Sequence, residues 1–180
     1  MPKDLTAPHF RRATEADAPA LARLHVEVWH ETYADLAPAE AIAALDYAHR
    51  LNSWRETLAD PARETLLAED DGMIGGLIAL GPGKGEAFGR LPGPVGEIKH
   101  LYVAASARRQ GLGARLMMQG FSRLQAQGYR SAALGVVRQN YAARLFYADI
   151  GGREVADYTD PGPLWRSLMV LVSWDLPEAG

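Results

Sequence analysis

The sequence predicts a mixed α/β fold: one twisted, mostly antiparallel sheet of about six to seven strands, flanked by helices on both faces. Strand-like and helical segments alternate along the chain, which places the two kinds of element in layers. Near the middle, an Asp-Gly step separates two apolar runs and indicates an antiparallel hairpin. Farther on, the order strand, helix, strand indicates a right-handed parallel crossover.

The first third of the chain is predicted to be mainly helical. A short strand is expected at residues 9–13, and Thr14 is a good N-cap with acidic residues in the turn after it. The helix that follows should run to about Trp29, because apolar residues repeat there at helical spacing: Leu21, Leu24 and Val28. Residues 37–60 predict one or two further helices.

The rest of the chain predicts most of the sheet. Residues 64–70 and 72–81 form the expected hairpin, with "EDDG" as its turn. The Gly/Pro-rich stretch from Gly81 to Pro94 predicts a surface loop, either a mobile lid over an acceptor or a plain connection. The elements expected after it are a strand at 95–103, a helix at 111–127, a strand at 131–137, a helix at 140–149 and a closing hairpin of 153–159 with 164–174.

Length and composition favour one globular domain spanning residues 1–180, since 180 residues suffice to bury one sizeable core. With 48% hydrophobic and 23% charged residues, the chain is too apolar for a disordered protein. The net charge of −3 gives no general attraction to nucleic acid, so no nucleic-acid partner is expected. Any anion must therefore be bound locally.

Cysteine is absent, which excludes disulfides, thiolate metal sites and a cysteine nucleophile. No signal-like apolar segment begins the chain, and nowhere do about 18 apolar residues follow one another. We therefore expect a cytoplasmic protein with no membrane partner. The histidines lack metal-ligand spacing, so no metal site is expected, and only His100 lies near the chemistry predicted below.

The segment "RRQGLGA", Arg108 to Ala114, predicts a local anion site where a strand passes into a helix. A helix N-terminus carries unpaired N–H groups and a partial positive charge, and Gly111 and Gly113 let the backbone approach a ligand. Arg108 adds forked donors that suit phosphate oxygens, as does the arginine after it. The alternative is a glycine-rich turn with solvated arginines. P-loop and dinucleotide-binding patterns do not fit.

The same segment resembles the [RQ]-x-x-G-x-[GA] signature of the GNAT superfamily of N-acetyltransferases. "NYAARLFYADIGG", which begins at Asn140, is similar to that family's N-x-x-A-x-x-[FL]-Y helix and its glycine turn. The resemblance extends over most of the chain. It implies a GNAT-type fold and transfer of an acetyl group from acetyl-CoA, as cosubstrate, to a primary amine on a small molecule or peptide. A homodimer is common in the family.

The resemblance also implies where CoA would lie. The pyrophosphate would bind the backbone N–H groups between Arg109 and Ala114, and the pantetheine arm would lie between the strand ending at Val103 and the strand beginning near Ser131. The backbone around Leu101 to Val103 would hold the thioester carbonyl oxygen. The candidate cofactor-binding residues are Leu101, Tyr102, Val103, Arg108, Arg109, Gln110, Gly111, Leu112, Gly113, Ala114, Asn140, Ala143 and Arg144.

In the helix expected at residues 140–149, the spacing places Asn140, Ala143 and Tyr147 on one face, with Arg144 at its edge. Asn140 is a candidate N-cap, a CoA contact or both. The resemblance implies that the Tyr147 phenol protonates the departing CoA thiolate, as a catalytic acid. The alternative for Tyr147 is a half-buried aromatic residue with a solvated hydroxyl.

Glu97 is the candidate catalytic base. It lies with Lys99 and His100 on a strand expected to be covered by helices, where charges seldom persist unpaired. A carboxylate beside the thioester could take the proton of the acceptor amine, directly or through water. Several members of the resembling family place a glutamate at this point. The alternative is a strand-end carboxylate in solvent or paired with Lys99 or an arginine, and a bulge there would change which side chains share a face.

Trp29 and Tyr33 are four residues apart on one helix face. They are candidates either for the core or for the wall of a substrate-binding site. Since no cysteine or serine–histidine pair is indicated, we expect direct transfer in a ternary complex. The alternative function is a non-catalytic acyl-CoA-binding or regulatory module of the same fold.

Overall fold

The computed structural model describes residues 8–178 and contains a seven-stranded sheet in the order β1-β2-β3-β4-β5-β7-β6. The strands are β1 (His9–Arg12), β2 (Glu64–Asp70), β3 (Met73–Pro82), β4 (Val95–Val103), β5 (Ser131–Val137), β6 (Arg153–Thr159) and β7 (Leu168–Asp175). The helices are α1 (Ala18–Tyr33), α2 (Ala39–Ala44), α3 (Tyr47–Ala59), α4 (Glu86–Gly89), α5 (Leu112–Ala126) and α6 (Tyr141–Asp149). Among the strands of residues 8–178, only β4 and β5 pair in parallel, which confirms the predicted mixed, mostly antiparallel sheet.

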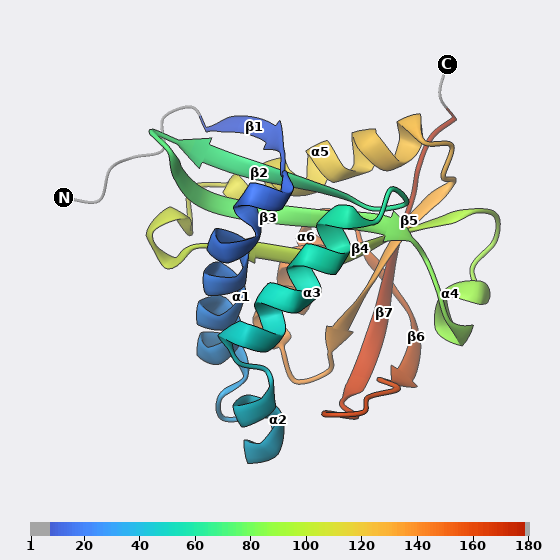
Figure 1. Cartoon of the computed structure of the whole chain (residues 1–180). Coiled ribbons are helices and arrows are strands. Elements are labelled where there is room, and N and C mark those ends of the chain that lie inside the picture. The colour runs from blue at the N-terminus through green and yellow to red at the C-terminus, as the bar shows by residue number, and fades with distance from the viewer. Residues whose placement is uncertain (1–7, 179–180) are drawn as a thin grey trace.

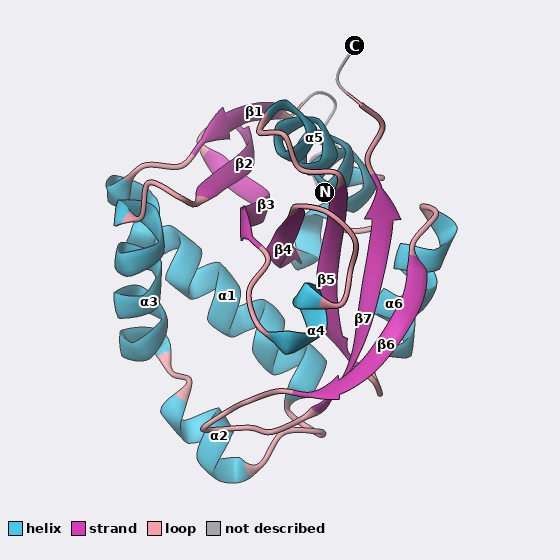
Figure 2. Cartoon of the chain, turned by 90° about the vertical axis from the view of Figure 1, so that its right-hand side faces the viewer, coloured by secondary structure: helices cyan, strands magenta, loops and turns pink. Residues whose placement is uncertain are grey.

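Helices cover both faces of the sheet, as predicted, with α1 and α3 in front of it in Figure 1. Alternate residues of each strand face opposite sides, so neighbours on β2 enter different cores. Leu67 packs with the apolar residues of α1 and α3, whereas Leu66 packs with those of α5 and α6. Figure 2 shows β7 between β5 and β6, where the predicted closing hairpin completes the sheet.

Two predicted boundaries differ from the structure by more than one residue. The first helix continues past Trp29 to Tyr33, which brings the Tyr33 ring over the site described below. The last strand starts at Leu168, because Trp165 packs against the rings of Trp29 and Tyr33, at centroid distances of 6.0 and 5.6 Å. Residues 37–60 form two helices, within the prediction.

The Gly81–Pro94 segment is less open than a surface loop. Its first two residues extend β3, and a short helix, α4, follows. Ala87 and Phe88 of α4 are buried against Ala133 and Leu171 of the sheet. This anchoring argues against a mobile lid.

The β2–β3 turn has the predicted hairpin conformation. Asp71 and Gly72 both take left-handed backbone angles, with φ of 48° and 75°. Two successive residues of this kind match the twist of the strands on either side, which is why Asp-Gly marks such turns.

The arrangement of β4 determines where a ligand can enter the sheet. Its pairing with β3 passes from His100 to Ile98 across consecutive β3 residues, so Lys99 is an extra, bulged residue. Its parallel pairing with β5 covers only Val95 to Glu97, after which β5 continues alone with β7. Beyond Glu97 the two neighbouring strands therefore diverge.

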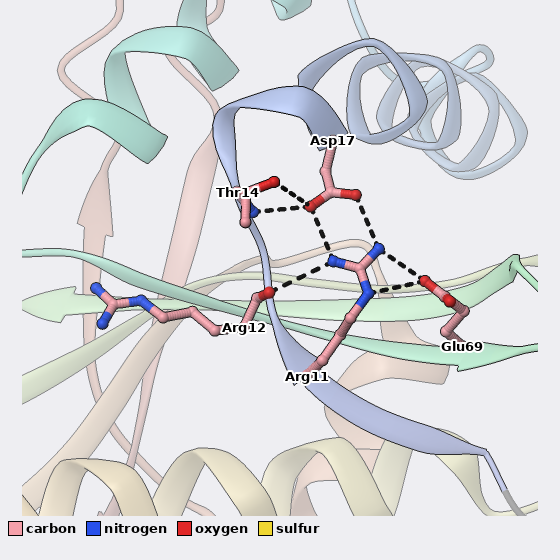
Figure 3. Close-up of polar contacts among 5 residues, drawn as sticks. All are labelled: Arg11, Arg12, Thr14, Asp17 and Glu69. Atoms are coloured by element: carbon pink, nitrogen blue, oxygen red, sulfur yellow. Dashed lines mark hydrogen bonds and ion pairs between the residues drawn. The ribbon is translucent and has the colours of Figure 1, made fainter.

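An ionic network fastens β1, β2 and the start of α1 together (Figure 3). Arg11 donates to Glu69 Oε2 from Nε at 2.9 Å and from Nη2 at 2.7 Å. Its Nη1 and Nη2 also donate to the two Asp17 oxygens at 2.9 and 2.8 Å. Asp17 in turn accepts the Thr14 N–H at 2.7 Å. The hydrogen bond from Arg11, more than any other cause, lowers the pKa of Asp17 to about 2.

We predict that Asp17→Asn lowers the free energy of unfolding at pH 7 by about 1–2 kcal/mol, since it removes a charge-assisted pair and a cap acceptor. Because the folded pKa of Asp17 lies below its usual value, the stabilisation is complete above about pH 4 and is lost as the pH falls toward 2. Urea unfolding at pH 7, 4 and 2.5 measures both effects. Asp35→Asn, on an exposed residue, is the control, and equal stabilities of Asp17→Asn and wild type at pH 7 would contradict the prediction.

Candidate functional site

The divergence of β4 and β5 opens a cleft of ≈ 480 Å³ between them, a volume within the range of small-molecule sites. Its walls are residues 98–103 of β4, residues 134–136 of β5 and the first turns of α6. Val28, Thr32 and Tyr33 of α1 line it as well. A ligand in this cleft would meet a strand edge that has lost its partner.

The loop from β4 to α5 forms one end of the cleft. Gly111 is the N-cap of α5 at φ 73°, a left-handed angle that favours glycine. Arg115 is the residue whose N–H bonds back to Gly111, so the N–H groups of Leu112, Gly113 and Ala114 have no acceptor within the helix. These donors can bind an anion.

Gly113 has a packing role that the sequence reasoning did not foresee. A Cβ at this position would lie 3.3 Å from Phe146 Cζ and 3.7 Å from Val103 Cγ2. The missing side chain therefore lets the start of α5 pack closely against α6.

Both arginines of the predicted anion site, Arg108 and Arg109, line the cleft. Arg108 is held in place, with Nη2 at 2.5 Å from Glu31 of α1 and Nε donating to the Val103 carbonyl at 3.2 Å. Arg109 takes a left-handed φ of 61°. Arg108 thus has two protein partners, and its side chain is 41% exposed.

The other predicted cofactor-binding residues divide into two groups. Leu101, Tyr102, Val103, Asn140 and Ala143 line the cleft together with Gly113 and the two arginines. Gln110, Gly111, Leu112 and Ala114 belong to the loop and first turn of α5 without lining it. Arg144 points to a different partner: it donates to both Glu154 carboxylate oxygens, at 2.6 and 3.0 Å, and lies outside the cleft lining.

Asn140 connects the two sides of the cleft. Its Oδ1 accepts the Ala143 N–H at 3.2 Å, which makes it the N-cap of α6. Its Nδ2 donates to the Tyr33 hydroxyl at 3.1 Å. The side chain thereby fixes α6 relative to the end of α1.

Tyr147, the candidate acid, lines the cleft and is buried, with its ring edge-on to Trp174 at 5.9 Å. Burial raises its pKa well above the usual range. The phenol therefore keeps its proton at neutral pH and can donate it.

Glu97, the candidate base, lines a second cavity of ≈ 400 Å³ that adjoins the cleft. Its side chain is 17% exposed and lies 3.7 Å from Lys99 Nζ. Burial raises its pKa in spite of that lysine. The first cleft and this second cavity share Ile98, Lys99, His100, Tyr102, Tyr33 and Gly135 in their linings, so the two spaces meet at the bulge of β4.

Trp29, Tyr33 and Trp165 form one wall of the second cavity. Trp29 and Tyr33 are 5.5 Å apart, and Trp165 packs against both rings. Trp165 comes from the β6–β7 connection, and no local sequence signal indicates its place beside α1.

A polar cluster between α1 and β4, with His25 buried and His100 and Tyr102 half-buried, was missed by the sequence reasoning. The Tyr102 hydroxyl lies 2.9 Å from His25 Nε2 and 3.2 Å from His100 Nδ1. Burial lowers the pKa of both histidines, that of His100 to about 3, so both are neutral at pH 7. The signal was present: His25 precedes Trp29 by four residues, and residues 100 and 102 share a strand face.

Other kinds of site find no support in the part of the chain described, residues 8–178. No cluster of three or more histidine, cysteine, aspartate or glutamate side chains there could hold a metal ion. Likewise, none of the helices in that range is long and apolar enough to cross a membrane.

Comparison with known protein families identifies the family of this chain. Residues 22–151 match the model of the acetyltransferase (GNAT) family. The chain belongs to the GNAT acetyltransferase family. A relative from Archaeoglobus fulgidus, named an uncharacterized N-acetyltransferase, is 32% identical over 77% of this chain and 88% of its own. The uncharacterized N-acetyltransferase YuaI of Bacillus subtilis is 27% identical over 82% of this chain and 81% of its own.

Among solved GNAT structures, the PaiA N-acetyltransferase of Thermoplasma acidophilum, in complex with coenzyme A, has a TM-score of 0.71. The match covers 94% of this chain and 99% of that one at 19% sequence identity. It therefore shows a shared fold across nearly the whole chain.

We predict that Asn140→Ala lowers the free energy of unfolding by about 1 kcal/mol, because α6 loses its N-cap acceptor. Asn140→Ser is the matched control, since a serine hydroxyl can still accept at this position, and it should recover most of the loss. Urea denaturation measures both. Equal losses in the two variants would mean that the cap contributes nothing.

Proposed function

We propose that this protein is an N-acetyltransferase that moves an acetyl group from acetyl-CoA to a primary amine within a ternary complex. The observation that carries the proposal is the junction at the β4 bulge. The cleft has a free strand edge and a helix N-terminus, and the cavity that adjoins it contains Glu97. A cosubstrate in the cleft and an acceptor in the cavity would meet at residues 98–102.

The residues of the cleft fit coenzyme A. The unpaired N–H groups at the start of α5, with Arg109 beside them, suit a pyrophosphate. The unpartnered edge of β4 offers backbone groups to the amides of a pantetheine arm, in the manner of an added strand. Acetyl-CoA would supply an acetyl thioester at the narrow end of the cleft.

Glu97 is suited to accept the proton of the acceptor amine. An alkylamine is mainly protonated at neutral pH and attacks only after losing that proton. Because burial raises the pKa of Glu97, its carboxylate is a stronger base than an exposed glutamate. Backbone N–H groups near Val103 would stabilise the negative charge that develops on the carbonyl oxygen.

Tyr147 is suited to protonate the sulfur of the leaving thiolate. Its phenol is neutral at pH 7, and it lines the cleft beside Ala143, a residue too small to block a ligand. Starting from the ammonium form, the acceptor nitrogen loses two protons and the sulfur gains one. Glu97 would take the first proton before the attack, and the Tyr147 phenolate left after protonation of the sulfur would take the second. Glu97 then returns its proton to solvent. No covalent acyl-enzyme is needed, and the chain contains no cysteine to form a thioester.

The test of this function combines release of free thiol from acetyl-CoA, against a panel of amines, with thermal melts in CoA. We predict that CoA raises the melting temperature and that at least one amine causes thiol release. A raised melting temperature without release for any amine would favour a non-catalytic acyl-CoA-binding module. No shift with CoA would contradict the cosubstrate.

We predict that Tyr147→Phe lowers kcat by about 10²- to 10⁴-fold with little change in CoA affinity, because the ring remains and only the acid is lost. Steady-state kinetics and calorimetric titration with CoA measure the two quantities. Tyr141→Phe, on an exposed ring at the start of the same helix, is the control. An unchanged kcat in Tyr147→Phe would remove this residue from the catalytic roles.

We predict that Glu97→Gln lowers kcat by a similar factor and changes the pH profile. In the wild type, kcat should fall with decreasing pH at a pKa above the usual glutamate value of about 4.3, because the carboxylate must be unprotonated to act. That inflection should be missing from Glu97→Gln and present in Glu40→Gln, on the surface helix α2. A profile identical in Glu97→Gln and wild type would rule out this base.

A further inference from the structure

Arg50 of α3 is a guanidinium in the wall of the second cavity that neither the fold nor the proposed chemistry accounts for. It lines that ≈ 400 Å³ cavity and also an adjoining one of ≈ 410 Å³ between α3 and β4. Its Cζ lies 5.6 Å from the centre of the Trp29 ring, which lines the same cavity. The charged end of the side chain is thus part of the space assigned to the acceptor.

No carboxylate neutralises Arg50 among residues 8–178. Arg11, Arg108 and Arg144 all form ion pairs there, whereas Arg50 forms none. Its Nε is buried without a hydrogen-bond partner, and burial lowers its pKa. A half-buried guanidinium without an ion pair in the wall of a ligand cavity is suited to bind an anion supplied from outside.

Of the lysine and arginine side chains that line the second cavity in the described structure, Arg50 is the one without an ion pair. Lys99 lies beside Glu97, and burial keeps the imidazoles of His25 and His100 neutral. Asp160 lines the cavity too and accepts the Gly162 N–H at 2.8 Å. Two carboxylates in the lining disfavour a doubly charged phosphate, whereas one planar carboxylate suits one guanidinium.

We propose that Arg50 binds a carboxylate of the acceptor, so that the acceptor is an amine that also carries a carboxylate, such as an amino acid. The same cavity then holds the two ends of one molecule, with the amine toward Glu97 and the carboxylate at Arg50. The rings of Trp29, Tyr33 and Trp165 pack against its apolar part. This inference rests on the proposed acetyl transfer and names the class of acceptor.

The kinetic test compares amino acids with their matched amides: alanine, leucine and phenylalanine, each against its carboxamide. For the wild type we expect kcat/KM to be about ten- to a hundredfold higher for the acid, the size of a charged hydrogen bond. In Arg50→Gln this ratio should fall toward one, because kcat/KM for the amino acid decreases while kcat/KM for its carboxamide changes little. Arg50→Lys should restore part of the ratio.

Arg55→Gln, on an exposed arginine of the same helix, is the matched control and should keep the wild-type ratio. A merely structural role for Arg50 would lower the melting temperature and slow acids and amides alike, leaving the ratio unchanged. Amides that react as well as acids in the wild type, or a ratio unaffected by Arg50→Gln, would overturn the inference and leave acetyl transfer standing.

A binding measurement separates this inference from the proposed function. Calorimetric titration of the CoA-loaded protein uses the N-acetylated forms of the same acids and amides, which have no amine to react. We expect the N-acetyl acids to bind at least about tenfold more tightly than the N-acetyl amides, and Arg50→Gln to abolish the difference. If the N-acetyl acids bind more tightly in this way but no amine is acetylated, the carboxylate site is supported and acetyl transfer is rejected. Binding of neither series, or equal binding of both, would reject the carboxylate site.

Discussion

The loss of pairing between β4 and β5 beyond Glu97 is the feature on which the rest of the site depends. Neighbouring strands inside a sheet normally form backbone hydrogen bonds along the edge that they share. Here the pairing of β4 with β5 ends after three residues of β4. The bulge at Lys99 interrupts the pairing of β4 with β3 at the same level, and a bulge bends its strand and increases the local twist. The lost pairing and the bulge together leave a free backbone edge beside the cleft and the cavity that adjoins it.

The walls of the opening are held by long-range contacts from α1. Tyr33 meets Asn140 of α6, and Glu31 meets Arg108 of the β4–α5 loop. Both contacts come from the end of α1, where the helix continues past Trp29, the end that the sequence predicted. Burial then sets the protonation states, because it raises the pKa of Glu97 and of the Tyr147 phenol. The same loss of solvation makes the Glu97 carboxylate a stronger base and keeps the Tyr147 phenol protonated.

Much of the fold was predictable because its signals are local. The Asp71-Gly72 turn and the glycine N-cap of α5 are fixed by backbone angles that few residues adopt. Contacts between distant segments could not be predicted in this way. Nothing near Trp165 indicates that it packs on α1, and nothing near Arg50 indicates a cavity shared with β4. Arg144, placed beside the cleft by its helical spacing, pairs instead with Glu154, which folding brings across from β6.

A crystal structure of the protein with coenzyme A tests most directly whether the gap between β4 and β5 is the ligand site. We expect the pantetheine arm beside residues 98–103 and the pyrophosphate within hydrogen-bond distance of the N–H groups of Leu112, Gly113 and Ala114. Coenzyme A bound elsewhere, or β4 and β5 paired along their full length with no ligand between them, would contradict this assignment.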